Sequence, residues 1–284
     1  MKPEDNKELE LLALKIREGV IRSTHAAKSG HPGGSLSAAD YFAYLYTKEI
    51  RVNPKNPQDP ERDRFVLSKG HVAPALYAAL ANVGFFPVDD LLKLRKIGSY
   101  LQGHPDMNRT PGVDMSTGSL GQGISAAAGM AKAAKYLKKN INVYTLLGDG
   151  ETQEGQVWEA ITFAVHYKLD NFCIAIDVNG LQIDGATKDV MNIEPLDKKF
   201  SAFGCAVTDI DGHNFDALEK AFKFFHDNQG TNKPTVILLR TVKGKGVSFM
   251  ENQADWHGKA PNDEQCQQAL NELADARKKI EEAA

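Results

Sequence analysis

The chain has 284 residues, 42% of them hydrophobic and 25% charged, which is the composition of an ordinary globular protein. Its 34 Lys and Arg residues nearly balance 37 Asp and Glu residues, leaving a net charge of −3, and no basic block indicates a nucleic-acid partner. We expect a cytoplasmic protein, because there is no signal peptide, no apolar run long enough to span a membrane, and only three scattered cysteines (Cys173, Cys205 and Cys266).

The N-terminal segment is predicted to be helical. Apolar residues recur at helical spacing from residue 7 to residue 28, and the Gly-rich segment 30–34 ends the pattern. A second helix is expected to follow, with Ser37 and Asp40 spaced as a capping box.

Loops dominate the next part of the chain. Residues 51–64 contain three prolines and are predicted to form a loop before a short buried strand at 65–67. Residues 98–123 are rich in glycine and too long for an ordinary connection, which favours a functional loop.

From residue 124 onward, helices alternate with strands. Buried strands are predicted at residues 143–147, 172–176, 206–210 and 235–239, and helices at residues 124–138, 154–167, 215–225 and from 263 onward. This alternation is typical of an α/β fold with a parallel sheet and helices on both faces. We expect one domain over residues 1–262 and a C-terminal helical extension over residues 263–284.

Polar residues follow three of the predicted strands. Asp149 and Asn179 lie about one βαβ unit apart, so they are expected to meet at the carboxyl edge of the sheet, where such folds bind ligands. A carboxylate and an amide oxygen suit magnesium with a diphosphate, although a lone Gly-Asp-Gly can also be a simple turn. The third strand end carries Asp211-Gly212-His213, where a turn or cap role is favoured for the histidine.

Four histidines lie in glycine-containing predicted loops: His31, His71 and His104 each follow a glycine, and His257 precedes one. Loop histidines of this kind are available to ligands, and no metal-type spacing joins them. They are therefore predicted to form hydrogen bonds or transfer protons. His166 and His226 lie within helices, where packing roles are favoured.

Several motifs occur in the order found in transketolases: Ser29-Gly30-His31-Pro32-Gly33, Ser68-Lys69-Gly70-His71, Gly103-His104-Pro105, residues 117–123, Gly148-Asp149-Gly150 and Trp256-His257-Gly258. From about residue 10 to residue 260 the chain resembles the N-terminal, diphosphate-binding domain of that family. The resemblance implies an enzyme that binds thiamine diphosphate and magnesium and transfers a two-carbon ketol unit from a ketose phosphate to an aldose phosphate.

The resemblance also implies residue roles. The magnesium ligands would be Asp149, Asn179 and the carbonyl of Leu181. Cofactor contacts would be His71, Gly118, Ser119, Leu120, Gly150, Lys243 and His257. Substrate binding and proton transfer would involve His31, His104 and His257. Glu154 and Glu159 match glutamates that link two cofactor sites, with Glu154 counted among the catalytic residues, although both could be solvated helix acids. Ile183 departs from the family pattern, since some relatives have a polar residue there.

The pyrimidine-binding domain of the family has no counterpart in this sequence, and with it the glutamate that contacts the aminopyrimidine ring. We therefore expect a C-terminal partner subunit, a dimer of such heterodimers, and no activity for the chain alone. Three alternatives remain: a split thiamine enzyme of another substrate class (similar to 1-deoxy-xylulose-5-phosphate synthase, or acting on a branched sugar), a non-catalytic subunit, and a magnesium phosphohydrolase.

Overall fold

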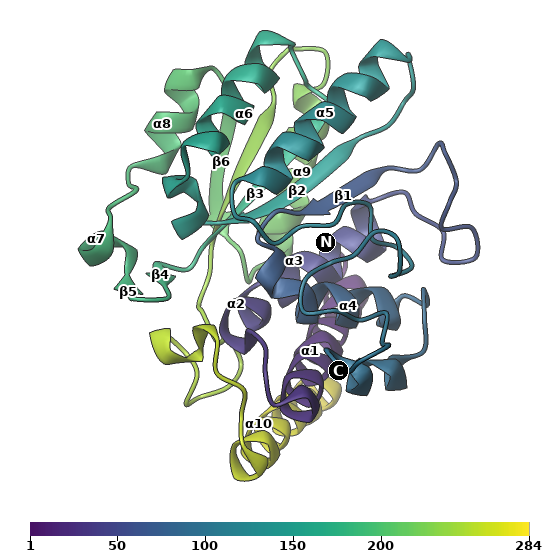
Figure 1. The fold of residues 1–284 in the computed structure, drawn as a ribbon, viewed down its shortest axis with the longest axis vertical. Coiled ribbons are helices and arrows are strands. Elements are labelled where there is room, and N and C mark those ends of the chain that lie inside the picture. Colours follow the sequence, from purple (N-terminus) through teal and green to yellow (C-terminus); the bar gives the residue numbers. More distant parts are fainter. Residues whose placement is uncertain (284) are drawn as a thin grey trace.

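A parallel sheet of five strands in the order β1-β2-β3-β7-β6 forms the centre of the computed structural model, which describes residues 1–283 (Figure 1). The strands are β1 (Arg64–Leu67), β2 (Val143–Gly148), β3 (Phe172–Val178), β6 (Ala206–Asp211) and β7 (Thr235–Arg240). All neighbouring strands pair in parallel. A separate antiparallel hairpin consists of β4 (Leu181–Gln182) and β5 (Gly185–Ala186).

The helices are α1 (Pro3–Ala27), α2 (Pro32–Ser37), α3 (Ala39–Tyr44), α4 (Ala73–Asn82), α5 (Gln122–Tyr136), α6 (Gly155–His166), α7 (Thr187–Val190), α8 (Leu196–Phe203), α9 (Phe215–Asn228) and α10 (Asp263–Glu282). In Figure 1, α5, α6 and α8 lie over one side of the sheet, and α1 to α4 and α10 lie on the other. None of the helices among residues 1–283 combines the length and the apolar character that a bilayer crossing requires.

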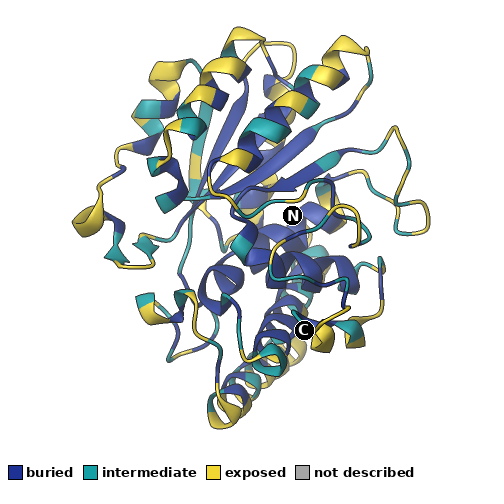
Figure 2. Ribbon diagram, in the orientation of Figure 1, coloured by how far each residue is buried: buried dark blue, intermediate teal, exposed yellow. Residues whose placement is uncertain are grey.

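Side chains that alternate between the two faces of the sheet form two hydrophobic cores, one on each face of the sheet. In β7, Val236 and Leu238 pack with α5, α6 and α8, whereas Ile237 and Leu239 pack with α1, α3, α4 and α9. Successive side chains of a strand point to opposite faces, so a strand buried on both faces is apolar throughout. Figure 2 shows β1, β2, β3 and β7 largely buried and the outer helix surfaces exposed. The prediction of a buried strand at 206–210 is wrong in its burial, because β6 is an edge strand with intermediate and exposed residues. The predicted α/β fold with helices on both faces is therefore confirmed.

Most predicted elements lie where the sequence placed them, but several details differ, among them helix α7 and the hairpin β4–β5, which were not predicted. Helices α4 and α8 were not predicted, because their segments lack a clear polar face or follow a proline-containing loop. The predicted capping box is wrong: Ser37 ends α2 and donates to Gly34 O (2.9 Å) and Asp177 Oδ2 (2.6 Å). Asp40 instead forms a buried ion pair with Arg17, so tertiary contacts replace the local cap.

Helix α10 packs along α1 and contributes Cys266, Ala269 and Leu273 to the same core. Its first turn has a capping box in which the Asn262 and Gln265 side chains each bond the other residue's backbone N–H. The predicted boundary at residue 262 stays a prediction.

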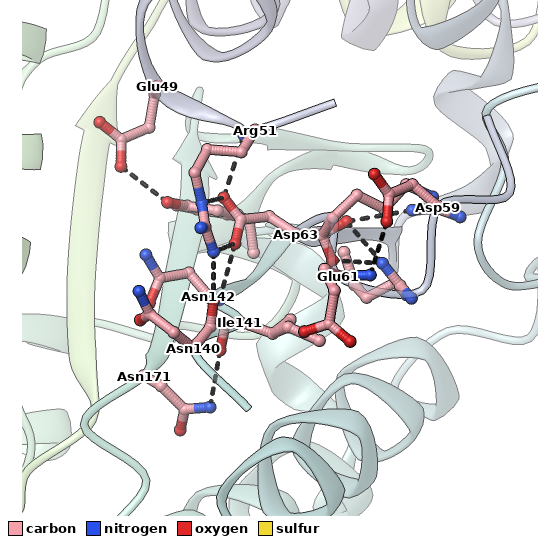
Figure 3. Close-up of polar contacts among 12 residues, drawn as sticks. Glu49, Arg51, Asp59, Glu61, Asp63, Asn140, Ile141, Asn142 and Asn171 are labelled. Atoms are coloured by element: carbon pink, nitrogen blue, oxygen red, sulfur yellow. Dashed lines mark hydrogen bonds and ion pairs between the residues drawn. The ribbon is translucent and has the colours of Figure 1, made fainter. Parts of the chain in front are cut away.

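A polar cluster closes the amino edge of the sheet, opposite the strand ends that carry the predicted site (Figure 3). We call Glu49, Arg51, Asp63 and Asn142 the amino-edge cluster. Asp63 is fully buried and accepts hydrogen bonds from the Arg51 guanidinium (2.7 and 3.1 Å), the Arg51 amide (3.0 Å) and the Asn142 amide (2.8 Å). These contacts fasten the loop before β1 to the start of β2.

Candidate active site

The carboxyl ends of β2 and β3 bring the two predicted oxygen ligands together. Gly148, the last residue of β2, pairs with Asp177 of β3, and Asp149 N–H donates to Asp177 O (3.1 Å). Parallel neighbours end at the same edge of a sheet, so Asp149 and Asn179 lie beside each other despite being thirty positions apart in the sequence.

Asp149 is a buried carboxylate held by backbone amides. It is 2% exposed, and its two oxygens accept from Gly150 N–H (2.7 Å) and Gly180 N–H (2.6 Å). Burial, with the negative charge of Asp177 close by, raises its pKa to about 6. A bound divalent cation would favour the ionised form of this group.

The oxygens around Asp149 form a set that suits magnesium. The Asn179 side chain and the Leu181 residue line the same cavity as Asp149. The carbonyl of Leu181 accepts from Lys243 Nζ (3.2 Å), so it faces the charged wall of this cavity. One carboxylate, one amide and one backbone carbonyl are hard oxygen donors, which magnesium prefers alongside water and phosphate oxygens. Within residues 1–283 no three His, Cys, Asp or Glu side chains gather as a metal site, and a set with a single carboxylate is consistent with that.

The cavity at this edge has a volume of about 300 Å³. Its lining includes nine of the predicted site residues: His71, Leu120, Asp149, Gly150, Glu154, Asn179, Leu181, Lys243 and His257. Gly118 and Ser119 instead line a separate hollow of about 170 Å³ beside the start of α5. The exposed Ile183 also lines the cavity, so this position presents an apolar side chain to it.

A buried lysine–aspartate pair lies at the cavity, which Lys69 lines, and was not predicted from the sequence. Lys69 and Asp177 are each 1% exposed and form an ion pair, and Ser37 and Thr241 also donate to Asp177. Burial by itself would raise the pKa of Asp177, but Lys69 and the hydroxyl donors hold it below its usual value. Lys69 lies within a motif that the sequence singled out, but its partner is 108 positions away.

The four loop histidines form one cluster beside the cavity. The His31 ring lies 5.2 Å from His71, 5.6 Å from His257 and 6.4 Å from His104, and His71 stacks on His257 at 5.1 Å between centroids. Burial lowers the pKa of His31 to about 4 and that of His257 to about 3. Burial also lowers the pKa values of His71 and His104. Near neutral pH these imidazoles are uncharged, so each can donate one hydrogen bond and accept another.

Lys243 connects the histidines to the predicted metal ligands. Its ammonium group lies 2.8 Å from His257 Nδ1 and 3.2 Å from the Leu181 carbonyl. Burial lowers the pKa of Lys243 to about 8. A lysine that is largely protonated near neutral pH therefore faces the cavity, where it could bind an anionic group.

Glu151 holds the Gly-rich loop against the sheet and was also missed. This buried carboxylate accepts from Ser68 Oγ (2.5 Å), Gly121 N–H (2.9 Å) and Gly148 N–H (3.1 Å). Burial raises its pKa. The pattern Gly-Asp-Gly-Glu was visible in the sequence, but nothing local indicated that the glutamate points inward rather than into solvent.

The loop glycine Gly118 allows a close contact with a histidine. Its φ is +153°, and a Cβ at this position would lie 3.0 Å from the His104 ring. The segment that contains Gly118 thus brings the His104 ring to within 6.4 Å of the His31 ring, and the functional role predicted for residues 98–123 stays a prediction. Glu154 and Glu159 are both exposed on the α6 side, with Glu154 at the cavity wall.

A family model described as "Transketolase, thiamine diphosphate binding domain" matches residues 10–280. The chain belongs to this family. It is 46% identical over 270 residues to "6-deoxy-6-sulfo-D-fructose transketolase subunit SqwG" of Clostridium sp. (strain MSTE9), covering 95% of this chain and 98% of the relative. It is 41% identical over 274 residues to one of the subunits of the apulose-4-phosphate transketolase of Phocaeicola vulgatus, covering 96% of each.

Solved transketolases have the same fold. The structure of transketolase from Campylobacter jejuni superposes with a TM-score of 0.86 at 31% identity, covering 96% of this chain. This chain spans 43% of the length of that transketolase. The resemblance to the thiamine diphosphate-binding domain of transketolases is therefore confirmed, and the relatives are named as transketolases or as subunits of them.

Proposed function

We propose that this chain is the N-terminal subunit of a two-chain transketolase and binds thiamine diphosphate with magnesium in the 300 Å³ cavity. The observation that supports this most directly is the meeting of Asp149, Asn179 and the Leu181 carbonyl with Lys243 at one strand edge. Oxygen donors for a cation and an ammonium group for an anion then line the same space, as a magnesium diphosphate requires.

In this proposal one group of residues binds the metal and a second group contacts the cofactor directly. Asp149, Asn179 and Leu181 hold the metal. His71, Gly150, Leu120 and Lys243 contact the cofactor from the cavity wall, and Gly118 and Ser119 do so from the adjoining loop. Gly150 packs closely against the hairpin, since a Cβ there would lie 3.3 Å from Gln182 Cβ. When bound, thiamine diphosphate supplies the electron sink for cleaving a carbon–carbon bond.

His31, His104 and His257 are proposed to bind the sugar hydroxyls and move protons. Their lowered pKa values keep these imidazoles neutral, so at His31 and His104 one ring nitrogen can accept a proton from a hydroxyl and return it in the same cycle, whereas His257 donates a hydrogen bond. Lys243 donates to His257 Nδ1 (2.8 Å), which leaves the proton of His257 on Nε2.

The proposed substrates are a ketose phosphate donor and an aldose phosphate acceptor. Two relatives are named for other sugars, 6-deoxy-6-sulfo-D-fructose and apulose 4-phosphate, so the sugar class requires direct measurement. A panel that compares xylulose 5-phosphate with pyruvate separates transketolase activity from a synthase of the 1-deoxy-xylulose-5-phosphate type.

The proposed partner is a second chain that carries the pyrimidine-binding domain and its glutamate. Relatives that this chain covers almost end to end are named as subunits. Exposed Glu154 and Glu159 are proposed to lie at the interface of a dimer of such heterodimers. A cytoplasmic location is proposed because all three cysteines are buried and unpaired.

The test is reconstitution. We expect thiamine diphosphate binding to depend on magnesium in calorimetry and ketol transfer to require both chains. Full turnover by this chain without a partner would refute the two-chain assignment. Magnesium-independent binding, or none with any candidate partner, would refute the cofactor site.

A further inference from the structure

His213 uses both ring nitrogens in hydrogen bonds outside the cavity. It follows β6 in the Asp211-Gly212-His213 tripeptide and is only partly exposed. Its Nδ1 lies 2.6 Å from Asp40 Oδ2, and its Nε2 accepts from Val242 N–H (2.9 Å). A ring that donates from one nitrogen and accepts at the other is a neutral imidazole with its proton on Nδ1.

The far side of this histidine is anchored by a buried ion pair. Arg17 of α1 donates to both oxygens of Asp40 in α3, at 3.1 and 2.5 Å. Arg17 is 6% exposed and Asp40 5%. Two hydrogen bonds from Arg17 hold the Asp40 carboxylate in place, although Arg17 Nε has no partner, and this carboxylate in turn fixes the His213 ring from the helical layer.

The near side of His213 fixes the segment that leads into the cavity. Val242 immediately precedes Lys243, whose ammonium group contacts His257 and the Leu181 carbonyl. The preceding residue, Thr241, donates through Oγ1 to Asp177. His213 and Asp177 therefore each hold this segment through a hydrogen bond, one to the Val242 amide and one from the Thr241 hydroxyl.

The glycine of the tripeptide allows this arrangement. A Cβ on Gly212 would lie 2.6 Å from Thr241 Cγ2 and 3.0 Å from Leu239 Cβ. Real Cβ atoms do not approach that closely, so any side chain would push the Thr241–Lys243 segment away from β6. The absence of a side chain at Gly212 thus lets the residues that follow β7 pack closely against the tripeptide.

We propose that His213 is a positioning residue: through the Val242 amide it fixes the Lys243 ammonium group at the cavity wall where a diphosphate would bind. This inference rests on the proposed function, and it assigns a role to the third polar strand end. Displacement of a binding group by about 1 Å is enough to weaken a preorganised site, so the effect should appear in cofactor affinity.

Two variants of His213 distinguish its hydrogen bond to Asp40 from its hydrogen bond to the Val242 amide. His213→Gln can reach Val242 with its side-chain carbonyl and retain the acceptor. His213→Asn is shorter and keeps only the donor to Asp40. We expect His213→Asn to weaken magnesium–thiamine diphosphate binding about 10-fold, the usual scale for partners of a direct ligand, and His213→Gln to stay close to the wild-type affinity.

A double-mutant cycle tests whether the effect passes through Lys243. In a Lys243→Met background, His213→Asn should cause no further loss of affinity, because residues that act as a unit are not additive. Asp63→Asn at the opposite edge is the control for general destabilisation, since it should lower the melting temperature without changing affinity.

Two measurements on the full chain, with its partner present if binding requires it, decide the outcome. Calorimetry gives the affinity, and hydrogen exchange at the Val242 amide in the cofactor-free protein should be slow in wild type and His213→Gln and fast in His213→Asn. Unchanged affinity in His213→Asn, or a loss that persists beside Lys243→Met, overturns the proposal. If the wild-type protein binds no cofactor with any partner, the proposed function is wrong. The exchange measurement needs no cofactor, so it still tests the positioning role: Val242 exchange that stays slow in His213→Asn would show that His213 does not hold this amide.

Discussion

Buried carboxylates lie at both edges of the sheet, but their partners differ. At the amino edge, Asp63 is neutralised by the Arg51 guanidinium, and Glu49 accepts from Tyr144 (2.7 Å) and His226 (2.8 Å). At the carboxyl edge, Asp149 accepts only backbone hydrogen bonds and lies beside a second carboxylate, Asp177.

This difference separates a structural cluster from a binding site. Desolvated charges that are fully paired hold loops and strands together. A buried carboxylate whose pKa is raised, beside histidines whose pKa values are lowered, is a feature of functional sites. In the proposed function a bound cation would give Asp149 the positive partner that it lacks, whereas Asp63 already has one in Arg51.

The largest expected effect is at Asp149. Asp149→Asn should weaken magnesium-dependent cofactor binding more than about 100-fold, since even partners of metal ligands cost 10- to 100-fold. It should lower the stability of the cofactor-free chain less than Asp63→Asn does: one of two backbone donors loses its acceptor, but one of two neighbouring buried negative charges is removed. Calorimetry measures the cofactor affinity, and thermal melts with and without magnesium measure the stability. If magnesium stabilised the variant as much as the wild-type protein, Asp149 would not be a cation ligand.

The opposite result is expected at Asp63. Asp63→Asn should reduce the free energy of unfolding by about 2 kcal/mol, because the Arg51 and Asn142 donors lose an ionised acceptor. Cofactor affinity should stay at the wild-type value. Denaturant titration and calorimetry test this, and a parallel loss of affinity would show that the amino edge is coupled to the site.

Glu151 is the intermediate case, a satisfied carboxylate at the carboxyl edge. Glu151→Gln should cost about 1 kcal/mol of stability, because its amide group cannot accept from all three donors. Affinity should fall only a few-fold, through displacement of Leu120 and Gly148. An effect on affinity as large as that of Asp149→Asn would assign Glu151 to the metal site instead.

The smallest effect concerns pH at the amino edge. The hydrogen bond from His226 to Glu49 raises the pKa of His226 above 6.5. A raised histidine pKa means that the contribution to stability is full below pH 6.5 and disappears as the pH rises through the folded-state value. Because the His226 side chain is 46% exposed, solvent screening limits the contribution of this ion pair to stability to about 0.5 kcal/mol. The stability difference between wild type and His226→Gln should therefore shrink with rising pH, and a difference that grows would contradict this assignment.

The sequence alone determined the alternation of strands and helices, the strand ends that carry Asp149 and Asn179, and the Gly-flanked histidines. These features are local: period-2 and period-3.6 patterns and turn residues are written in consecutive positions. The meeting of Asp149 with Asn179 could also be anticipated, because parallel strands joined by one helix end at the same edge.

Only the tertiary structure decided which polar groups are paired across long separations. Lys69 with Asp177, Arg17 with Asp40 and Glu151 with the Gly121 amide each join segments that are distant in the chain. Their side chains carry no local sign of an inward direction, and a Ser37–Asp40 capping box was the plausible local alternative. Burial in the folded molecule removes water as a competitor, so pairing across the fold prevails over pairing along the chain.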